Sequence, residues 1–453
     1  MTKNHPNYIS TTNACKLCKP LGACLAFKGI EGAVPYLHGS QGCATYMRRY
    51  IISHYNEPID IASSSLSEKH AVYGGGPNLK LGLTNVTKKY RPQMIGIATT
   101  CLTETIGDDV SMFLREYILD TSSSTGLPDL VNVSTPSYSG THMEGFHGAV
   151  YQVIKQRAEG GPKTTTVNLL PGFVSSADYR LLKEIMTDFE LGCTMLPDLS
   201  ETMDGPALLE YEKIPAGGTP LSAIKAMGRS RATIELGRTL DDEETGGNEL
   251  EKTYKVRNHR LGMPIGIEET DRLFDLLVNL SGHPVPEKYM AQRGRLVDAY
   301  VDGHKYIFGK KAIIYGEEDL VVGMSAFLAE IGIFPVLCAS GGTSGRLAEA
   351  IYDVTADILP NQPGVHEGMD FFEISEIAET LVPDLIIGHS KGYPLARKLN
   401  IPLIRVGFPI HDRVGGQRIL HLGYSGAQQL FDTITNAIIA KKQTDSSVGY
   451  SYM

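Results

Sequence analysis

Short apolar runs alternate with amphipathic segments along nearly the whole chain. The runs have the length and density of buried strands, and the most regular span residues 92–100, 130–133, 164–170, 192–197, 232–236, 310–316, 335–338 and 383–388. Segments with the apolar spacing of a helix lie between them, at residues 44–54, 78–90, 145–157, 178–188, 221–228, 268–280, 285–306 and 317–331. Because strands alternate with helices, we expect parallel sheets with right-handed crossover connections.

Glycine and proline divide this alternation into units. Residues 158–162, with the sequence Ala-Glu-Gly-Gly-Pro, have the composition of a linker, and a new unit begins with the strand pattern at 310–316. A chain of 453 residues is also too long for a single core. We predict an α/β fold of three Rossmann-like domains with parallel sheets. Their expected ranges are 1–160 with the N-terminal cysteines, 161–308, and 309–453 with a C-terminal helix.

Charge and hydropathy exclude several classes of partner. The net charge of −9 argues against binding to nucleic acid or to a membrane surface. No apolar run reaches the roughly 18 residues of a membrane-spanning helix, and the first residues lack the apolar core of a signal peptide. We therefore expect a cytoplasmic protein, in which clustered cysteines are metal ligands or redox groups more often than disulfides.

Cysteines are concentrated near the N-terminus. Four of the seven lie between positions 15 and 43, among several glycines that let the backbone approach a bulky ligand, and Cys101 ends the apolar run 92–100. Cys18, Cys43 and Cys101 occupy Gly- or Thr-rich turns, where a packing role is less natural. The remaining thiols at 24, 193 and 338 lie in apolar runs and are expected to pack in the core. This pattern predicts an iron–sulfur protein.

The predicted helices and strands place two of these thiols where a ligand could bind. Cys43 precedes the helix 44–54, where the helix N-terminus favours a thiolate, and Cys101 follows a strand at the sheet edge where α/β proteins bind ligands. His38 could donate a hydrogen bond to a sulfide or a carbonyl from the second shell. Cys15 and Cys18 could form a redox pair, although no thioredoxin-like strand precedes them. No zinc-type quartet and no phosphate-binding loop occurs, so the chain is not expected to hydrolyse ATP.

A series of motifs resembles the beta subunits of nitrogenase molybdenum–iron proteins and their relatives, over nearly the whole chain. In order, the matching segments are residues 18–23, 35–43, 57–58, 99–104, 107–109, 135–137, 282–286, 293–298 and 405–413. In that family, the positions of Cys18, Cys43, Cys101 and Ser137 correspond to the beta-side ligands of the eight-iron P-cluster.

Other segments resemble one branch of the superfamily, the beta-like (NifN-type) subunit of the scaffold on which the iron–molybdenum cofactor is assembled. They are residues 196–206, 214–220 and 408–418, the last of which continues Asp412-Arg413 with Val-Gly-Gly-Gln where catalytic subunits tend to have histidines. The segment before Cys18 also lacks the long extension of some catalytic subunits. Because ligand-type residues stand at all four P-cluster positions, a catalytic subunit is the alternative interpretation.

The scaffold resemblance implies an α2β2 assembly with an alpha-like (NifE-like) partner. A [4Fe–4S] cluster at each α–β interface would take Cys43 from this chain and relay electrons from the nitrogenase iron protein. The partner would hold most of the cofactor precursor, which a radical-SAM enzyme supplies and which passes to the apo molybdenum–iron protein. Cys18, Cys101 and Ser137 are further candidate ligands.

Two other functions remain as alternatives. A catalytic beta subunit would share an eight-iron P-cluster with its alpha partner and reduce N2. A cluster-free α/β protein that binds a small molecule is the third possibility, which the cysteine-rich turns disfavour. The iron content of the protein distinguishes the scaffold subunit, the catalytic subunit and the cluster-free protein.

Overall fold

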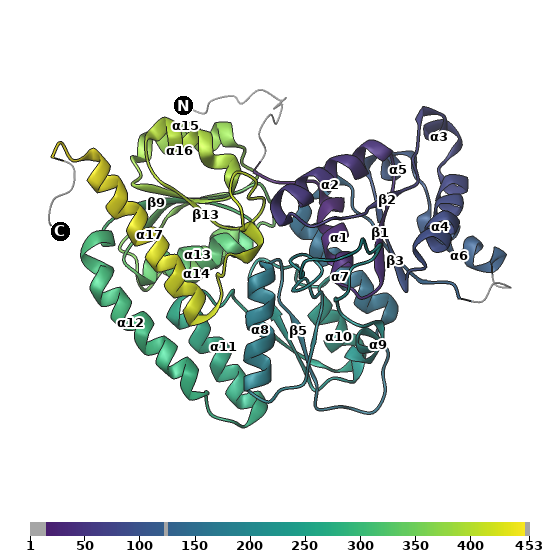
Figure 1. Cartoon of the computed structure of the whole chain (residues 1–453), viewed down its shortest axis with the longest axis horizontal. Helices are drawn as coiled ribbons and strands as arrows, with labels where there is room; N and C mark the ends of the chain where they lie inside the picture. The colour runs from purple at the N-terminus through teal and green to yellow at the C-terminus, as the bar shows by residue number, and fades with distance from the viewer. Residues whose placement is uncertain (1–14, 122–125, 449–453) are drawn as a thin grey trace.

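Three parallel sheets, each flanked by helices, make up the chain. The computed structural model describes residues 15–121 and 126–448. In Figure 1 the first sheet lies at the right, the third at the upper left, and the second between and below them. Every strand pairing among the described residues is parallel, which confirms the predicted α/β class.

The first sheet has the strand order β2-β1-β3-β4. Its strands are β1 (Ala33–His38), β2 (Ala62–Ser63), β3 (Met94–Thr99) and β4 (Asp129–Val133). Its helices are α1 (Lys19–Lys28), α2 (Gln41–Tyr55), α3 (Glu68–Tyr73), α4 (Gly76–Tyr90), α5 (Cys101–Ile106), α6 (Val110–Asp120), η1 (Ser137–Ser139) and α7 (His142–Arg157). Strands β1 and β3 are buried along their whole length, and the continuous apolar run 92–100 predicts this for β3.

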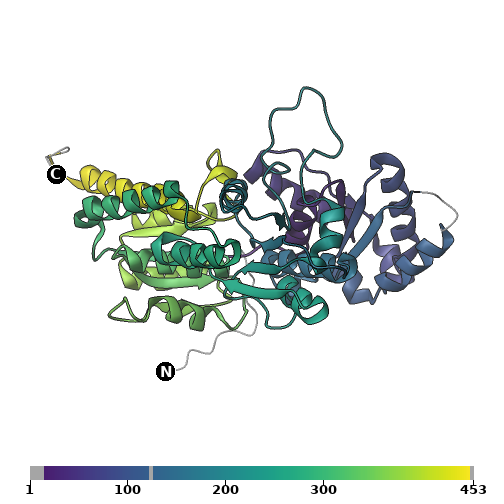
Figure 2. The same ribbon diagram turned by 90° about the horizontal axis from the view of Figure 1, so that it is seen from below.

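The second sheet has the order β6-β5-β7-β8. Its strands are β5 (Val167–Leu170), β6 (Cys193–Met195), β7 (Ala232–Leu236) and β8 (Arg257–Leu261). The associated helices are α8 (Ser176–Asp188), α9 (Leu221–Ala226), η2 (Met227–Arg229), α10 (Gly246–Tyr254), α11 (Gly266–Ser281) and α12 (Glu287–Ile307). Between β6 and α9 the chain forms a long irregular loop that stands away from the body in Figure 2.

The third sheet has the order β11-β10-β9-β12-β13. Its strands are β9 (Lys311–Gly316), β10 (Phe334–Ser340), β11 (Gly364–His366), β12 (Leu385–Gly388) and β13 (Leu403–Arg405). Its helices are α13 (Glu318–Glu330), α14 (Leu347–Thr355), α15 (Phe371–Leu381), η3 (Ser390–Gly392), α16 (Tyr393–Leu399), η4 (Gly416–Arg418) and α17 (Gly423–Asp445). No described helix has both the length and the apolar character needed to cross a membrane.

The strands of each sheet fall within one of the three predicted ranges, but the core is shared. One hydrophobic cluster includes Val131, Leu169 and Ile314, one from each sheet. The C-terminal helix α17 returns to pack on α11 and α12, where Phe431 lies 5.0 Å from Tyr300 between ring centroids. The domain boundaries at 160 and 308 stay predictions, because these contacts join the units on either side of residue 308.

Two glycines set the closest helix contact near the N-terminus. A Cβ atom at Gly22 of α1 would lie 1.7 Å from the backbone oxygen of His142, and one at Gly145 of α7 would lie 1.8 Å from the backbone oxygen of Lys19. Only glycine allows this approach, because neither backbone can accept a side chain at that distance. Helix α1 is thereby held directly on α7.

Several helix boundaries differ from the predicted ones. The acidic segment 103–109 predicts the start of a single helix, but the structure has two helices there, because Gly107 takes a left-handed φ of 77° and Asp109 then caps α6. The acidic composition of residues 241–248 predicts a solvated loop, but only the first four are exposed. Thr245 accepts a hydrogen bond from the backbone of Asn248 and begins helix α10, which the sequence pattern did not reveal.

Candidate functional site

The four predicted ligand positions lie at one edge of the first sheet. Cys43 is the third residue of α2, which follows β1, and Cys101 is the first residue of α5, which follows β3. Ser137 begins η1 after β4, and Cys18 caps α1. Because β1, β3 and β4 are parallel neighbours, their carboxyl ends meet at the same edge. We call this group of four the thiol edge.

Contacts within the thiol edge show that its members are neighbours. The backbone N–H of Ser137 donates to Cys101 Sγ at 3.2 Å. Burial raises the pKa of the Cys18 thiol, and the nearby thiols of Cys101 and Cys43 raise it further. A hydrogen bond from the Ser137 side chain to Cys18 opposes that rise. The structure thus brings together four residues that are up to 119 positions apart, from 18 to 137.

Exposure separates the edge thiols from the packing thiols. Cys18, Cys43 and Cys101 are partly exposed and free of disulfides, whereas Cys24 and Cys338 are fully buried. Burial raises the pKa of Cys338 to about 12, so that thiol stays protonated. The expected packing roles of Cys24 and Cys338 are confirmed. Cys193 is partly exposed, but it packs against the main core cluster, as expected.

The thiol edge has the donor chemistry of an iron–sulfur site. Thiolates are soft ligands suited to iron–sulfur clusters, and the start of α2 favours a negative charge at Cys43. Ser40 Oγ lies 3.5 Å from Cys43 Sγ as a hydrogen-bond donor. Among the described residues, no three His, Cys, Asp or Glu side chains converge to hold a single metal ion. Partly exposed donors of this kind fit a larger group whose remaining ligands come from another chain.

His38 does not have the predicted second-shell role. Its Nε2 atom lies 3.0 Å from Asp108 Oδ2, and its Nδ1 atom lies 3.0 Å from Ser64 Oγ, so both ring nitrogens are engaged within the chain. Ser64 Oγ in turn accepts a hydrogen bond from Gly39 N at 2.8 Å. The ring therefore stabilises the turn that leads to Cys43, and the expected donation to a sulfide is wrong.

Three further histidines, His54, His70 and His142, lack metal-ligand spacing in the sequence and have structural roles. His54 Nδ1 accepts a hydrogen bond from Ile410 N at 2.9 Å, and burial lowers the pKa of this ring to about 3. His70 completes the capping box of α3. His142 Nε2 lies 2.9 Å from Glu317 Oε1, in a buried pair that joins α7 to the start of α13.

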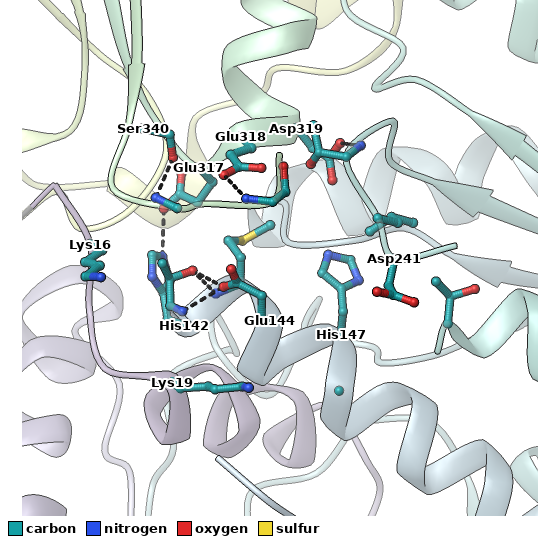
Figure 3. Close-up of a pocket in the computed structure, with 18 of the residues that line it drawn as sticks. Lys16, Lys19, His142, Glu144, His147, Asp241, Glu317, Glu318, Asp319 and Ser340 are labelled. Carbon is teal, nitrogen blue, oxygen red and sulfur yellow. Dashed lines mark hydrogen bonds and ion pairs between the residues drawn. The ribbon is translucent and has the colours of Figure 1, made fainter. Parts of the chain in front are cut away.

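A cavity of about 360 Å³, which the sequence did not reveal, lies where the three sheets meet. Its walls come from the segment before α1, the first turns of α7 and α13, and residues 239–245 (Figure 3). The acidic run Glu317-Glu318-Asp319 directly after strand β9 is the sequence signal that could have indicated it. None of the four thiol-edge residues lines this cavity.

Glu318 is the most strongly perturbed acid in the cavity wall. Burial raises the pKa of its carboxyl to about 7, and the charges of Glu367 and Glu144 act in the same direction. The side chain accepts a hydrogen bond from Ser344 N at 3.3 Å, which opposes the rise. A buried acid with a pKa near neutrality in a cavity wall is typical of a functional site.

We expect Glu318→Gln to stabilise the fold at alkaline pH. The folded protein has the higher pKa, about 7 against the ordinary 4.5, so the wild type loses stability as pH rises through this window. The variant should unfold at nearly the wild-type temperature at pH 5. At pH 8 its free energy of unfolding should be larger by on the order of 2–3 kcal/mol. Calorimetry at both pH values measures the difference.

Glu349→Gln is the matched control, because Glu349 is an exposed residue of α14 outside the cavity wall. It removes the same charge and should change the unfolding temperature little at either pH. Equal pH dependence in the wild type and the Glu318→Gln variant would contradict the assignment of a raised pKa to Glu318.

The fold and the thiol edge define a class of protein: a three-sheet parallel α/β protein with three thiols and a serine gathered at one edge of its first sheet. A family model described as nitrogenase component 1 type oxidoreductase matches residues 18–439. The chain therefore belongs to the nitrogenase component 1 family, in which it is beta-chain-like.

Curated relatives support this placement over the whole length. The nitrogenase molybdenum-iron protein beta chain of Clostridium pasteurianum is 36% identical over 433 residues, covering 95% of this chain and 93% of the relative. The beta chain from Azotobacter vinelandii is 35% identical over 454 residues, covering 95% of this chain and 84% of the relative.

Solved structures agree with the fold. The chain in a structure described as "Nitrogenase Cp1 at pH 6.5" superposes with a TM-score of 0.94 at 33% identity, covering 100% of this chain and 98% of the other. A chain from "Nitrogenase Cp1 at pH 5" reaches 0.71 at 13% identity, covering 98% of this chain and 94% of the other, and shows the fold alone.

Proposed function

We propose that this chain is the beta-like subunit of the scaffold on which the iron–molybdenum cofactor of nitrogenase is matured. One structural observation supports the scaffold subunit over the catalytic subunit. The scaffold-like segments 196–206 and 408–418 are in direct contact, although about 200 residues separate them. Gln417 Nε2 donates to Asp204 Oδ1 at 3.1 Å, and Arg418 pairs with the same carboxylate at 3.3 Å.

The segment 408–418 also contacts helix α2. Gln417 is buried and also donates to the backbone oxygen of Tyr55 at 2.9 Å, at the end of α2. A Cβ atom at Gly416 would lie 2.8 Å from the ring of His54, so a larger residue there would displace α2. Two motifs that resemble the scaffold therefore contact each other and the C-terminal end of α2, the helix whose first turn carries Cys43, which supports reading them together.

In this proposal the chain contributes one ligand, Cys43, to a [4Fe–4S] cluster shared with an alpha-like partner in an α2β2 assembly. When bound, the cluster supplies low-potential electron transfer. The α2 N-terminus and the Ser40 hydroxyl stabilise the Cys43 thiolate, and the buried pair of His38 and Asp108 holds the preceding turn. Electrons would come from the nitrogenase iron protein, while molybdenum and homocitrate join the precursor in the partner.

A second function is favoured by separate observations. The relatives described above are named as molybdenum-iron protein beta chains, and all four members of the thiol edge are present and adjacent. A catalytic beta subunit would use Cys18, Cys43, Cys101 and Ser137 for half of an eight-iron P-cluster. The two functions share the fold, the heterotetramer and the role in nitrogen fixation, and they differ in the number of irons.

Iron content of the anaerobically co-purified complex, with the partner's cofactor site left empty, tests the proposal. We expect about four irons per αβ unit and an EPR signal of a reduced [4Fe–4S] cluster. About eight irons, with a signal only after oxidation, would instead assign the catalytic subunit. Ser137→Ala provides a matched variant: it should leave the four-iron signal unchanged, whereas it would alter the oxidation behaviour of an eight-iron cluster that uses Ser137.

A further inference from the structure

The cavity at the junction of the three sheets has the build of a binding site separate from the thiol edge. Its volume of about 360 Å³ lies in the range of small-molecule pockets, which begin at about 300 Å³. Figure 3 shows His142, His147 and Glu144 on one side and Glu317, Glu318 and Asp319 facing them from above. These side chains come from α7 and from the start of α13, which belong to different sheets.

Charges in the cavity wall are strongly unbalanced. Six carboxyl groups line it, against two lysines. The carboxyl groups belong to Glu144, Asp241, Glu244, Glu317, Glu318 and Asp319. Of the lysines, Lys19 directs its Nζ atom to the oxygen atoms of Ser139, at 3.3 and 3.4 Å. The cavity therefore presents a negative potential, which attracts a cation and repels an anion.

The carboxylates in the cavity wall differ in how many hydrogen bonds and ion pairs they form within the protein. Glu317 pairs with His142 at 2.9 Å, and Asp319 Oδ1 accepts from the backbone of Arg238 at 2.7 Å and of Thr239 at 2.9 Å. Glu318 is bonded by Ser344, whose backbone N–H donates at a longer 3.3 Å and whose side chain also interacts with the carboxylate. Its carboxylate therefore keeps capacity for a ligand inside the cavity.

Two further groups in the wall point to a polar ligand. Asp241 lies at the exposed rim, and its carboxylate accepts hydrogen bonds from the backbone of its own loop. The Nε2 atom of His147 is buried and has no hydrogen-bond partner in the described part of the chain. A polar group in the cavity, from a ligand or a water, would complete the bonding of this atom.

We propose that this cavity binds a small organic cation, an aliphatic di- or polyamine, whose ammonium groups pair with the Glu318 carboxylate inside and the Asp241 carboxylate at the rim. A bare metal ion fits less well, because no three ligating side chains of the described residues converge. A nucleotide or a dicarboxylate would bring negative charge to a wall that already carries it. This site does not depend on how many irons the thiol edge helps to hold.

Calorimetric titration of the intact complex at pH 8 tests the inference, with putrescine as the probe. We expect one putrescine bound per copy of this chain. Neutral 1,4-butanediol and anionic succinate, which have similar length, should not bind. Glu318→Gln should weaken putrescine binding by about tenfold or more, because it removes the buried charge that the ammonium group pairs with.

Two more variants keep the test decisive. Asp241→Asn changes an exposed residue, so it should fold normally and weaken binding by a smaller factor. Glu349→Gln, outside the cavity, should bind putrescine like the wild type. Equal binding of 1,4-butanediol, or unchanged affinity in both cavity variants, would overturn the inference. Stoichiometric binding of Mg²⁺ that excludes putrescine would overturn it too and make the site a metal site.

Discussion

Replacing Cys43 by alanine should abolish the interfacial cluster signal while the chain still folds. Cys43 is the one position that both proposed functions use as a ligand. Its sulfur is partly exposed and lies within hydrogen-bonding distance of the Ser40 hydroxyl, at 3.5 Å. Loss of the thiol removes little buried surface, so the unfolding free energy should fall by no more than about 1 kcal/mol. EPR of the reduced complex and its iron content measure the loss.

Cys24→Ala is the matched control for this experiment. Cys24 lies on α1 in the same cysteine-rich segment but is fully buried in the core. The control should keep the cluster signal and lose stability by about 1 kcal/mol or more, because it leaves a small cavity. A full cluster signal in Cys43→Ala would exclude Cys43 as a ligand and with it both proposed functions of the thiol edge.

Gly22→Ala should strongly destabilise the protein. A methyl group at this position would lie 1.7 Å from the backbone oxygen of His142, so α1 and α7 would have to separate. Overpacking against a side chain costs about 1–3 kcal/mol, and contact with a fixed backbone should exceed that range. We expect a large loss of soluble protein and a lower unfolding temperature, measured by thermal unfolding of the complex.

Gly148→Ala tests whether any change at a glycine of α7 has this effect. The added Cβ would lie 3.7 Å from Val133 Cγ2, an ordinary contact, and alanine favours the helix by up to about 1 kcal/mol. This variant should therefore be as stable as the wild type or slightly more stable. Wild-type stability of Gly22→Ala would mean that the two helices can separate freely, which the close packing contradicts.

Much of the fold follows from local patterns. The apolar run 92–100 predicts β3 and places Cys101 at the carboxyl end of that strand, where parallel α/β sheets bind ligands. The apolar run 130–133 likewise predicts β4, whereas Ser137 is a candidate ligand only through the family resemblance. Strand periodicity and sheet-edge geometry depend on residues that are close in the sequence, so they can be predicted from short segments.

Contacts between distant segments could not be predicted in the same way. The ring of His38 is engaged by Ser64 and Asp108, which lie 26 and 70 residues further along the chain. The cavity wall combines His147 of α7 with Glu318 of α13, and neither segment has a pattern that reveals the other. Their meeting depends on how whole sheets pack, which is set by the shared core and not by any one segment.

The glycine contact between α1 and α7 has a mechanical consequence. Cys18 caps α1, and His142, at the start of α7, lines the cavity. Hydrogen bonds also join Leu17 to His142, from Leu17 N to the ring at 3.4 Å and from His142 N to Leu17 O at 3.1 Å. Because no side chain separates the two backbones at the crossing, the starts of α1 and α7 form one rigid unit. A displacement of the start of α7, which lines the cavity, would therefore require the start of α1 to move with it, and Cys18 lies there.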